Sequence, residues 1–130
     1  MNCTVTRQNL HKGLAAVSAS LPRKTTLPVL SNILIEAGED GFWMSGTDLD
    51  VSVRVWTAAD VKEQGSLTAP GKKLQEIARE LPDRPVDMVT RGDQIELKCG
   101  KSHFKLNGLP SDEFPTLPEV SFDEGWSVRP

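Results

Sequence analysis

Two stretches of the chain carry apolar residues at the spacing of an α-helix. The first starts after Thr6, a residue type that often caps helices, and runs to about Ala19. Its apolar positions are Leu10, Leu14, Val17 and Leu21. The second covers residues 71–82, with apolar positions Leu74, Ile77, Ala78 and Leu81. Each stretch predicts an amphipathic helix that buries one face and leaves the other in water.

The rest of the chain alternates apolar and polar residues, which is typical of half-buried strands. We expect strands within residues 2–7, 29–38, 41–48, 49–58, 65–70, 85–91, 93–100 and 102–108. Hairpin turns are indicated at Glu39-Asp40-Gly41 and at Gly92-Asp93. Turns this short join antiparallel strands, so the pattern predicts an α+β fold with two helices packed on one face of a continuous antiparallel sheet.

The order of predicted elements repeats. A shift of 64 residues aligns Thr4 with Thr68 and Leu10 with Leu74. A shift of 53 aligns further pairs of apolar or turn residues, namely Ile33 with Val86, Ile35 with Met88, Asp40 with Asp93, Phe42 with Ile95, Val51 with Phe104 and Val53 with Leu106. Alternating patterns align by chance, and that alternative stays open. The shared order favours two βαβββ repeats.

Charge is distributed unevenly along the chain. The net charge is −3, yet residues 1–35 contain four Lys and Arg residues and no acid, whereas residues 111–130 contain five acids and one base. Two of the cations, Arg23 and Lys24, lie between Pro22 and Pro28. Each proline restricts its own backbone and that of the preceding residue, so this segment is expected to be a stiff basic loop.

Catalytic and cofactor motifs are weak. "CGKS" at residues 99–102 lacks the earlier glycine of a phosphate-binding loop, because that position is Ile95. Cys99 and His103 have no second pair with which to complete a metal site, and Asp48 and Asp50 fit a solvated hairpin better than a cation site. We therefore expect no catalytic residues, no metal and no cofactor.

The sequence also suggests where the protein works. It contains no apolar run long enough to span a bilayer and no signal-peptide core near its start, so we expect a cytoplasmic protein without a membrane partner. Its two cysteines, Cys3 and Cys99, are too few for a disulfide scaffold and are interpreted as small core residues.

Several cations are expected on the helix-bearing face: Arg7, Lys12, Arg23, Lys24, Lys72 and Lys73. The alternative is that these charged residues only keep the helices soluble and bind nothing. No aromatic residue accompanies these cations, which argues against stacking on single-stranded bases. The pattern fits weak contacts with a nucleic-acid backbone that do not depend on base sequence.

Four stretches give the chain a family resemblance: "LPVLSNILIEA", "GTDLDVSV", "APGKKLQEIARELP" and "KSHFKLNGLPSDEFP". With these, in this order, the chain resembles the N-terminal domain of the bacterial DNA polymerase III beta subunit, the sliding-clamp family. The resemblance implies the DNA-clamp fold. It also implies a non-catalytic processivity factor for DNA replication, in which two chains of three domains form a ring around double-stranded DNA with helices lining the hole.

The resemblance also implies functional residues. Lys24 and Lys72 correspond to DNA-contacting positions, with Arg23, Arg7 and Lys12 as further candidates. Lysine at positions where the family often has arginine is expected to give looser phosphate contacts. The implied contact with a second protomer involves Phe104, Leu106, Lys73, Lys101 and His103. The cations around this predicted edge strand have a second interpretation, which is protection against aggregation.

The implied domain organisation is a first clamp domain over residues 1–120, followed by a linker and the start of a truncated second domain over residues 121–130. DNA polymerase III and the clamp loader are implied partners of the full-length clamp, through a cleft in its other domains. An alternative function is a protein-interaction module that uses the exposed edge strand.

Overall fold

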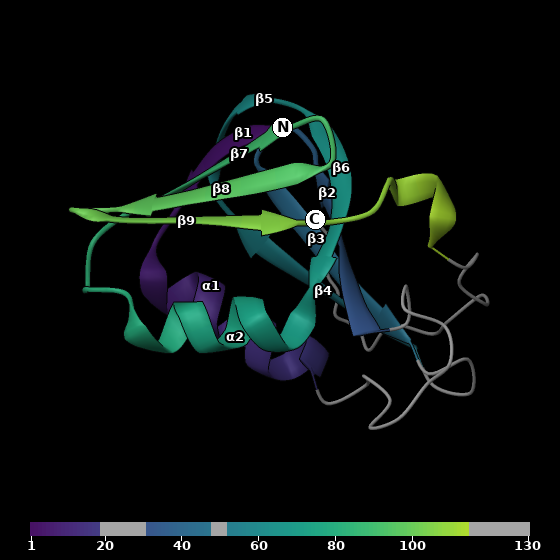
Figure 1. The fold of residues 1–130 in the computed structure, drawn as a ribbon, viewed down its shortest axis with the longest axis horizontal. Helices are drawn as coiled ribbons and strands as arrows, with labels where there is room; N and C mark the ends of the chain where they lie inside the picture. The colour runs from purple at the N-terminus through teal and green to yellow at the C-terminus, as the bar shows by residue number, and fades with distance from the viewer. Residues whose placement is uncertain (19–30, 48–51, 115–130) are drawn as a thin grey trace.

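The computed structural model describes residues 1–18, 31–47 and 52–114 (Figure 1). Predictions for Leu21, Arg23, Lys24, Asp48, Asp50 and residues 121–130 lie outside this part of the chain. The helices within it are α1 (Arg7–Ser18) and α2 (Gly71–Glu80). The strands are β1 (Asn2–Val5), β2 (Asn32–Ala37), β3 (Gly41–Thr47), β4 (Ser52–Ala58), β5 (Asp60–Glu63), β6 (Gly65–Pro70), β7 (Val86–Arg91), β8 (Gln94–Cys99) and β9 (Ser102–Asn107). A short 3-10 helix, η2, covers Ser111–Glu113.

The strands form two antiparallel sheets in the described residues, with orders β5-β1-β7-β8-β9 and β4-β3-β2-β6. The expectation of one continuous sheet is therefore wrong, although the α+β class is confirmed. The smaller sheet ends at β6. The side of β6 that faces away from β2 forms hydrogen bonds with Leu109. The amide of Thr68 donates to the Leu109 carbonyl at 3.0 Å, and the Leu109 amide donates back at 3.1 Å.

The predicted duplication is confirmed by strand register. One repeat is β1-α1-β2-β3-β4 and the other is β6-α2-β7-β8-β9. Thr4 pairs with Asp87, and the positions related to them by the two shifts, Thr68 and Leu34, also pair. The repeats exchange their first strands, because β1 joins the hairpins of the second repeat and β6 joins those of the first. Neither half therefore has a complete sheet of its own.

The match between repeats fails at the last strand. Phe42 and Ile95 are equivalent, but Phe42 pairs with Thr57 and Ile95 pairs with Leu106. Leu106 therefore corresponds to Thr57, and by the same register Phe104 corresponds to Val55. The predicted equivalences of Val53 with Leu106 and of Val51 with Phe104 are wrong. The cause is the spacing within each hairpin, because Thr57 follows Phe42 by 15 residues whereas Leu106 follows Ile95 by 11. A shift of four residues preserves alternation, so the sequence pattern could not reveal it.

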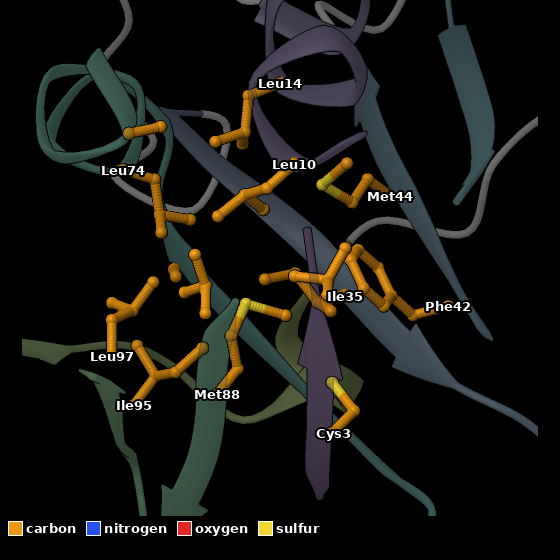
Figure 2. Close-up of a cluster of buried hydrophobic side chains, with 14 of the residues drawn as sticks. Cys3, Leu10, Leu14, Ile35, Phe42, Met44, Leu74, Met88, Ile95 and Leu97 are labelled. Atoms are coloured by element: carbon orange, nitrogen blue, oxygen red, sulfur yellow. The ribbon is translucent and has the colours of Figure 1, made fainter. Parts of the chain in front are cut away.

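A single core lies between the helices and the two sheets (Figure 2). Of the predicted apolar positions, Leu10, Leu14, Val17 and Leu74 are at most 1% exposed, and Ile77 is half-buried against the core. Cys3 and Cys99 are buried as predicted. At the start of α1, the amide of Asn9 donates to Thr6 Oγ1 at 3.1 Å, which confirms the predicted cap.

Glycine allows α1 to approach the smaller sheet closely. A Cβ atom at Gly13 would lie 2.9 Å from Thr57 Oγ1 and would overlap the Met44 side chain. The helix therefore contacts β3 and β4, while α2 contacts β2, β6 and α1. This packing leaves one side of each helix facing away from both sheets (Figure 1).

Candidate nucleic-acid interface

The two helices lie side by side and run in opposite directions. Arg7, the first residue of α1, contacts the last turn of α2 through Ala78 and Arg79. Figure 1 shows the pair below the sheets, with β5 at the opposite end of the molecule. The pair therefore forms one continuous outer surface.

Lys12 and Lys72 lie on that outer surface. Both residues are exposed. At 3.6 residues per turn, Lys12 projects from the side of α1 opposite Leu10, and Lys72 projects from the side of α2 opposite Leu74. The structure thus brings two of the predicted DNA-binding residues to one face. Arg23 and Lys24 lie outside the described residues.

The helices have the opposite charge to the rest of the chain. Together they contain five Lys and Arg residues and two Glu residues, a charge of +3 with histidine neutral. The whole chain carries −3, so the remainder carries −6. Neither helix contains an aromatic residue. This local positive charge can attract an anionic polymer even though the protein as a whole is acidic.

The start of α2 adds backbone donors to this face. Pro70 precedes the helix and provides no side-chain cap, and the first turn contains Lys72 and Lys73 but no acid. The first N–H groups of a helix have no intrahelical acceptor, and the helix dipole is positive at this end. The arrangement suits a phosphate group better than a base edge.

The residues predicted for a protomer interface are divided between surfaces. Phe104 and Leu106 are half-buried and pack against the core, whereas His103 is exposed on the opposite side of β9. Lys101 lies in the turn before β9. Lys73 lies on the flank of α2 that also carries the half-buried Ile77. Strand β9 is the edge of its sheet in the described residues.

His103 belongs to a polar cluster that the sequence analysis missed. Its Nε2 lies 2.8 Å from Glu96 Oε2, and Arg91 Nε donates to Glu96 Oε1 at 2.9 Å. The Glu96 side chain is only 10% exposed. The hydrogen bond from His103, followed by the charges of Arg91 and Lys105, lowers the pKa of Glu96 below its ordinary value of 4.5, although desolvation opposes the shift. Glu96 and His103 lie on the paired strands β8 and β9, and this proximity was the signal from which their contact could have been predicted.

Glu96 should make the stability of the protein depend on acid. A carboxylate whose pKa is lower in the folded state stabilises the fold above its unfolded pKa, and that contribution is lost as the pH falls through the folded value. We therefore expect Glu96→Gln to be less stable than wild type at pH 6, with the difference shrinking below about pH 4.5. Urea unfolding between pH 3 and 6 measures this. A difference that is independent of pH would contradict it.

A second cluster that the sequence analysis missed lies on β3 and β4. The rings of Trp43 and Trp56 meet edge to face with centroids 5.2 Å apart. The Arg54 guanidinium lies 4.1 Å from the Trp43 centroid and 3.7 Å from a Glu36 carboxylate oxygen. The tryptophans are directly opposite in the hairpin, so the cluster stabilises a sheet edge.

The Cys3 thiol and the "CGKS" stretch both have structural surroundings. Burial raises the pKa of the Cys3 thiol to about 11, so it stays protonated at neutral pH. Gly100 and Lys101 form the turn between β8 and β9, where a phosphate-binding loop would require a helix to follow. Among the described residues, no three His, Cys, Asp or Glu residues are grouped to hold a metal. No described helix is both long and apolar enough to cross a bilayer.

Comparison with known proteins identifies the family. Residues 1–118 match the model of the DNA polymerase III beta subunit, N-terminal domain. This chain belongs to the DNA polymerase III beta subunit family. The beta sliding clamp of Streptomyces coelicolor is 38% identical over 120 residues, which are 92% of this chain and 32% of that protein. The beta sliding clamp of Vibrio harveyi is 36% identical over 122 residues, 92% of this chain and 83% of that sequence.

Solved structures of beta subunits have the same fold. The Caulobacter crescentus polymerase III beta structure matches with a TM-score of 0.88 and 36% identity, covering 93% of this chain and 34% of that one. The beta subunit of Pseudomonas aeruginosa matches with a TM-score of 0.86 and 35% identity, covering 92% and 33%. The present chain thus spans about a third of these structures, and it has the DNA-clamp fold.

Proposed function

We propose that this domain contacts double-stranded DNA through the outer face of α1 and α2. The observation that carries the proposal is the +3 charge of the helix pair in a chain of net charge −3. Lys12 and Lys72 are the described contact residues, and the family resemblance adds Lys24 and Arg23 as further proposed contacts. Flexible lysines without stacking partners favour mobile phosphate contacts over base recognition.

The domain acts, in this proposal, as the first part of a ring-forming clamp. The relatives named beta sliding clamp support this role. A ring that surrounds DNA remains bound by topology, so its inner charges need only weak contacts that allow movement. The role is non-catalytic: the ring keeps DNA polymerase III on its template, and the clamp loader is a further partner of the full-length protein.

The second protomer is proposed to bind along β9. Phe104 and Leu106 offer half-buried apolar surface at a sheet edge, with Lys73 on the α2 flank, Lys101 in the turn and His103 on the other side of the strand. An edge strand with few apolar side chains and several cations resists indiscriminate pairing but still accepts a partner of complementary charge. Residues 1–120 form the proposed first domain, with a linker and the start of a second domain in residues 121–130.

Salt dependence of DNA binding tests the proposal. Each phosphate contact contributes about −0.9 to the slope of log affinity against log salt concentration, so Lys72→Ala should make the slope less steep by about 0.9. The control is Lys62→Ala, which removes the same charge from exposed β5, at the end of the molecule away from the helices (Figure 1). Wild-type affinity should be the same for duplexes of equal length and different sequence.

The same measurement distinguishes the second candidate function. The free edge of β9 in the described residues favours a protein-interaction module that does not need DNA. Absence of salt-dependent duplex binding by the wild type would contradict the clamp proposal and leave this module as the better account. Equal effects of Lys72→Ala and Lys62→Ala would contradict the assignment of the helix face.

A further inference from the structure

Arg7 joins the two helices through a directed pair of hydrogen bonds. Its Nε donates to the Ala78 carbonyl at 3.3 Å, and its Nη2 donates to the Arg79 carbonyl at 3.1 Å. The donor is the first residue of α1, and both acceptors lie in the last turn of α2. The planar guanidinium fits two neighbouring acceptors at once, which an ammonium group cannot do in the same way.

The end of α2 needs an external donor. The carbonyl of Ala78 would ordinarily accept from the residue four positions later, but that residue is Pro82, which has no N–H. Leu81 follows the helix in an extended conformation, with φ −70° and ψ 143°, so the left-handed glycine cap that satisfies many helix ends is missing. Arg7 supplies both the missing hydrogen bonds and a positive charge at the negative end of the helix dipole.

The Arg7 side chain has no counterpart on α2. The shift of 64 residues that relates the repeats places Gly71 at the position equivalent to Arg7. Glycine has no side chain, so α2 has no equivalent reach towards α1. Among the described residues, Arg7 therefore provides the side-chain hydrogen bonds that join the two helices at this end of the pair, in addition to the buried contacts.

We infer that Arg7 is a positioning residue. It holds α2 against α1 so that Lys12 and Lys72 lie on one surface, and it does not itself contact phosphate. The inference rests on the proposed DNA contact, but it gives Arg7 a different task from the lysines, because its guanidinium is already oriented towards the carbonyls of α2.

Variants Arg7→Ala and Arg7→Lys separate the possible roles, with Lys62→Ala as the control for lost charge. Both Arg7 variants should lower the melting temperature by about 3–6 °C, because lysine keeps the charge but not the paired geometry. Amide hydrogen exchange in residues 77–81 should become faster in both. Lys62→Ala should change neither quantity.

DNA binding is then measured at a temperature where each variant is fully folded. A positioning role predicts lower affinity than wild type at every salt concentration, with an unchanged slope. If Arg7 contacted phosphate directly, Arg7→Ala would make the slope less steep by about 0.9 and leave the melting temperature unchanged. That result would overturn the inference, and so would a lower melting temperature with wild-type affinity and slope.

The two proposals fail in different ways. Wild-type protein without salt-dependent binding would remove the proposed function and, with it, the positioning role. The positioning role alone would be removed if the wild type binds DNA, Lys72→Ala weakens that binding, and Arg7→Ala gives either of two results. These results are a less steep slope with an unchanged melting temperature, or a lower melting temperature with wild-type affinity and slope. If Arg7→Ala fails to fold, Arg7→Lys carries the same comparisons.

Discussion

Replacement of Leu14 by alanine is expected to lower the free energy of unfolding by about 2–5 kcal/mol. Leu14 is fully buried, and Figure 2 shows its side chain directed from α1 into the core. The substitution removes buried apolar surface and leaves a cavity that the surrounding sheets cannot fill easily. A loss of this size is a large share of the stability of a typical domain.

Urea unfolding measures the effect of Leu14→Ala. The midpoint should fall while the slope of free energy against urea concentration stays unchanged. Lys12→Ala is the matched control, because Lys12 is exposed on the opposite side of the same helix. A loss below about 1 kcal/mol, or one equal to that of the control, would show that α1 does not depend on its apolar face as described.

Replacement of Gly41 by alanine is the second large effect, with an expected loss of about 1–3 kcal/mol. A Cβ atom at this position would overlap the backbone carbonyl of Thr57, and it would lie 2.8 Å from Trp56 Cζ2 and 3.0 Å from Ala58 Cα. Two of these neighbours are backbone atoms of β4 in register with β3, so they cannot move aside without breaking the ladder.

Gly38 provides the control for this substitution. It lies in the same hairpin, and a Cβ atom there would meet only the Gly41 carbonyl oxygen, at 3.9 Å. Gly38→Ala should therefore change stability by less than about 0.5 kcal/mol. Thermal unfolding of the two variants compares them directly. Equal effects would mean that glycine is needed at Gly41 for reasons other than close packing against β4.

Periodicity predicted the parts of this fold that depend on one face being buried. Leu10, Leu14 and Leu74 follow the helical period, and they are buried. Residues aligned by the repeat shifts occupy equivalent positions where β1 pairs with β7 and β6 pairs with β2. Register is preserved there because a slip of one residue would turn a strand's apolar side towards water. Alternation carries this information in each strand separately, so it needs no knowledge of the neighbouring strand.

The sequence pattern could not predict which strands become neighbours in a sheet. The exchange of β1 and β6 between repeats depends on which edges meet in space, and the pattern of each strand is the same in either sheet. Strand β5 was missed because it is only four residues long and Val61 is its single apolar position. The contact between Arg7 and α2 spans 71 residues of sequence and depends on an unpaired carbonyl, which becomes visible only once the helices are placed.

In the candidate site, too, the sequence predicted which residues share a face of a helix but not which residues contact each other across strands. The sequence predicted that Lys12 and Lys72 would share a face, since each lies opposite a buried leucine on its helix. The family resemblance groups His103 with Phe104 and Leu106, and adjacent residues of a strand project to opposite sides. His103 contacts Glu96 on one side of β9, and the two apolar residues pack against the core on the other.

The most direct test of the helix-face account is a titration of the isotope-labelled chain with a short DNA duplex, followed by ¹H–¹⁵N spectra at low salt. The account predicts that the amides near Lys12 in α1 and near Lys72 in α2 shift, and that these shifts disappear as salt is added. Amides of the exposed Gln94 and Lys98 on β8 should stay in place. Shifts concentrated on β8, with those of α1 and α2 unchanged, would contradict the account.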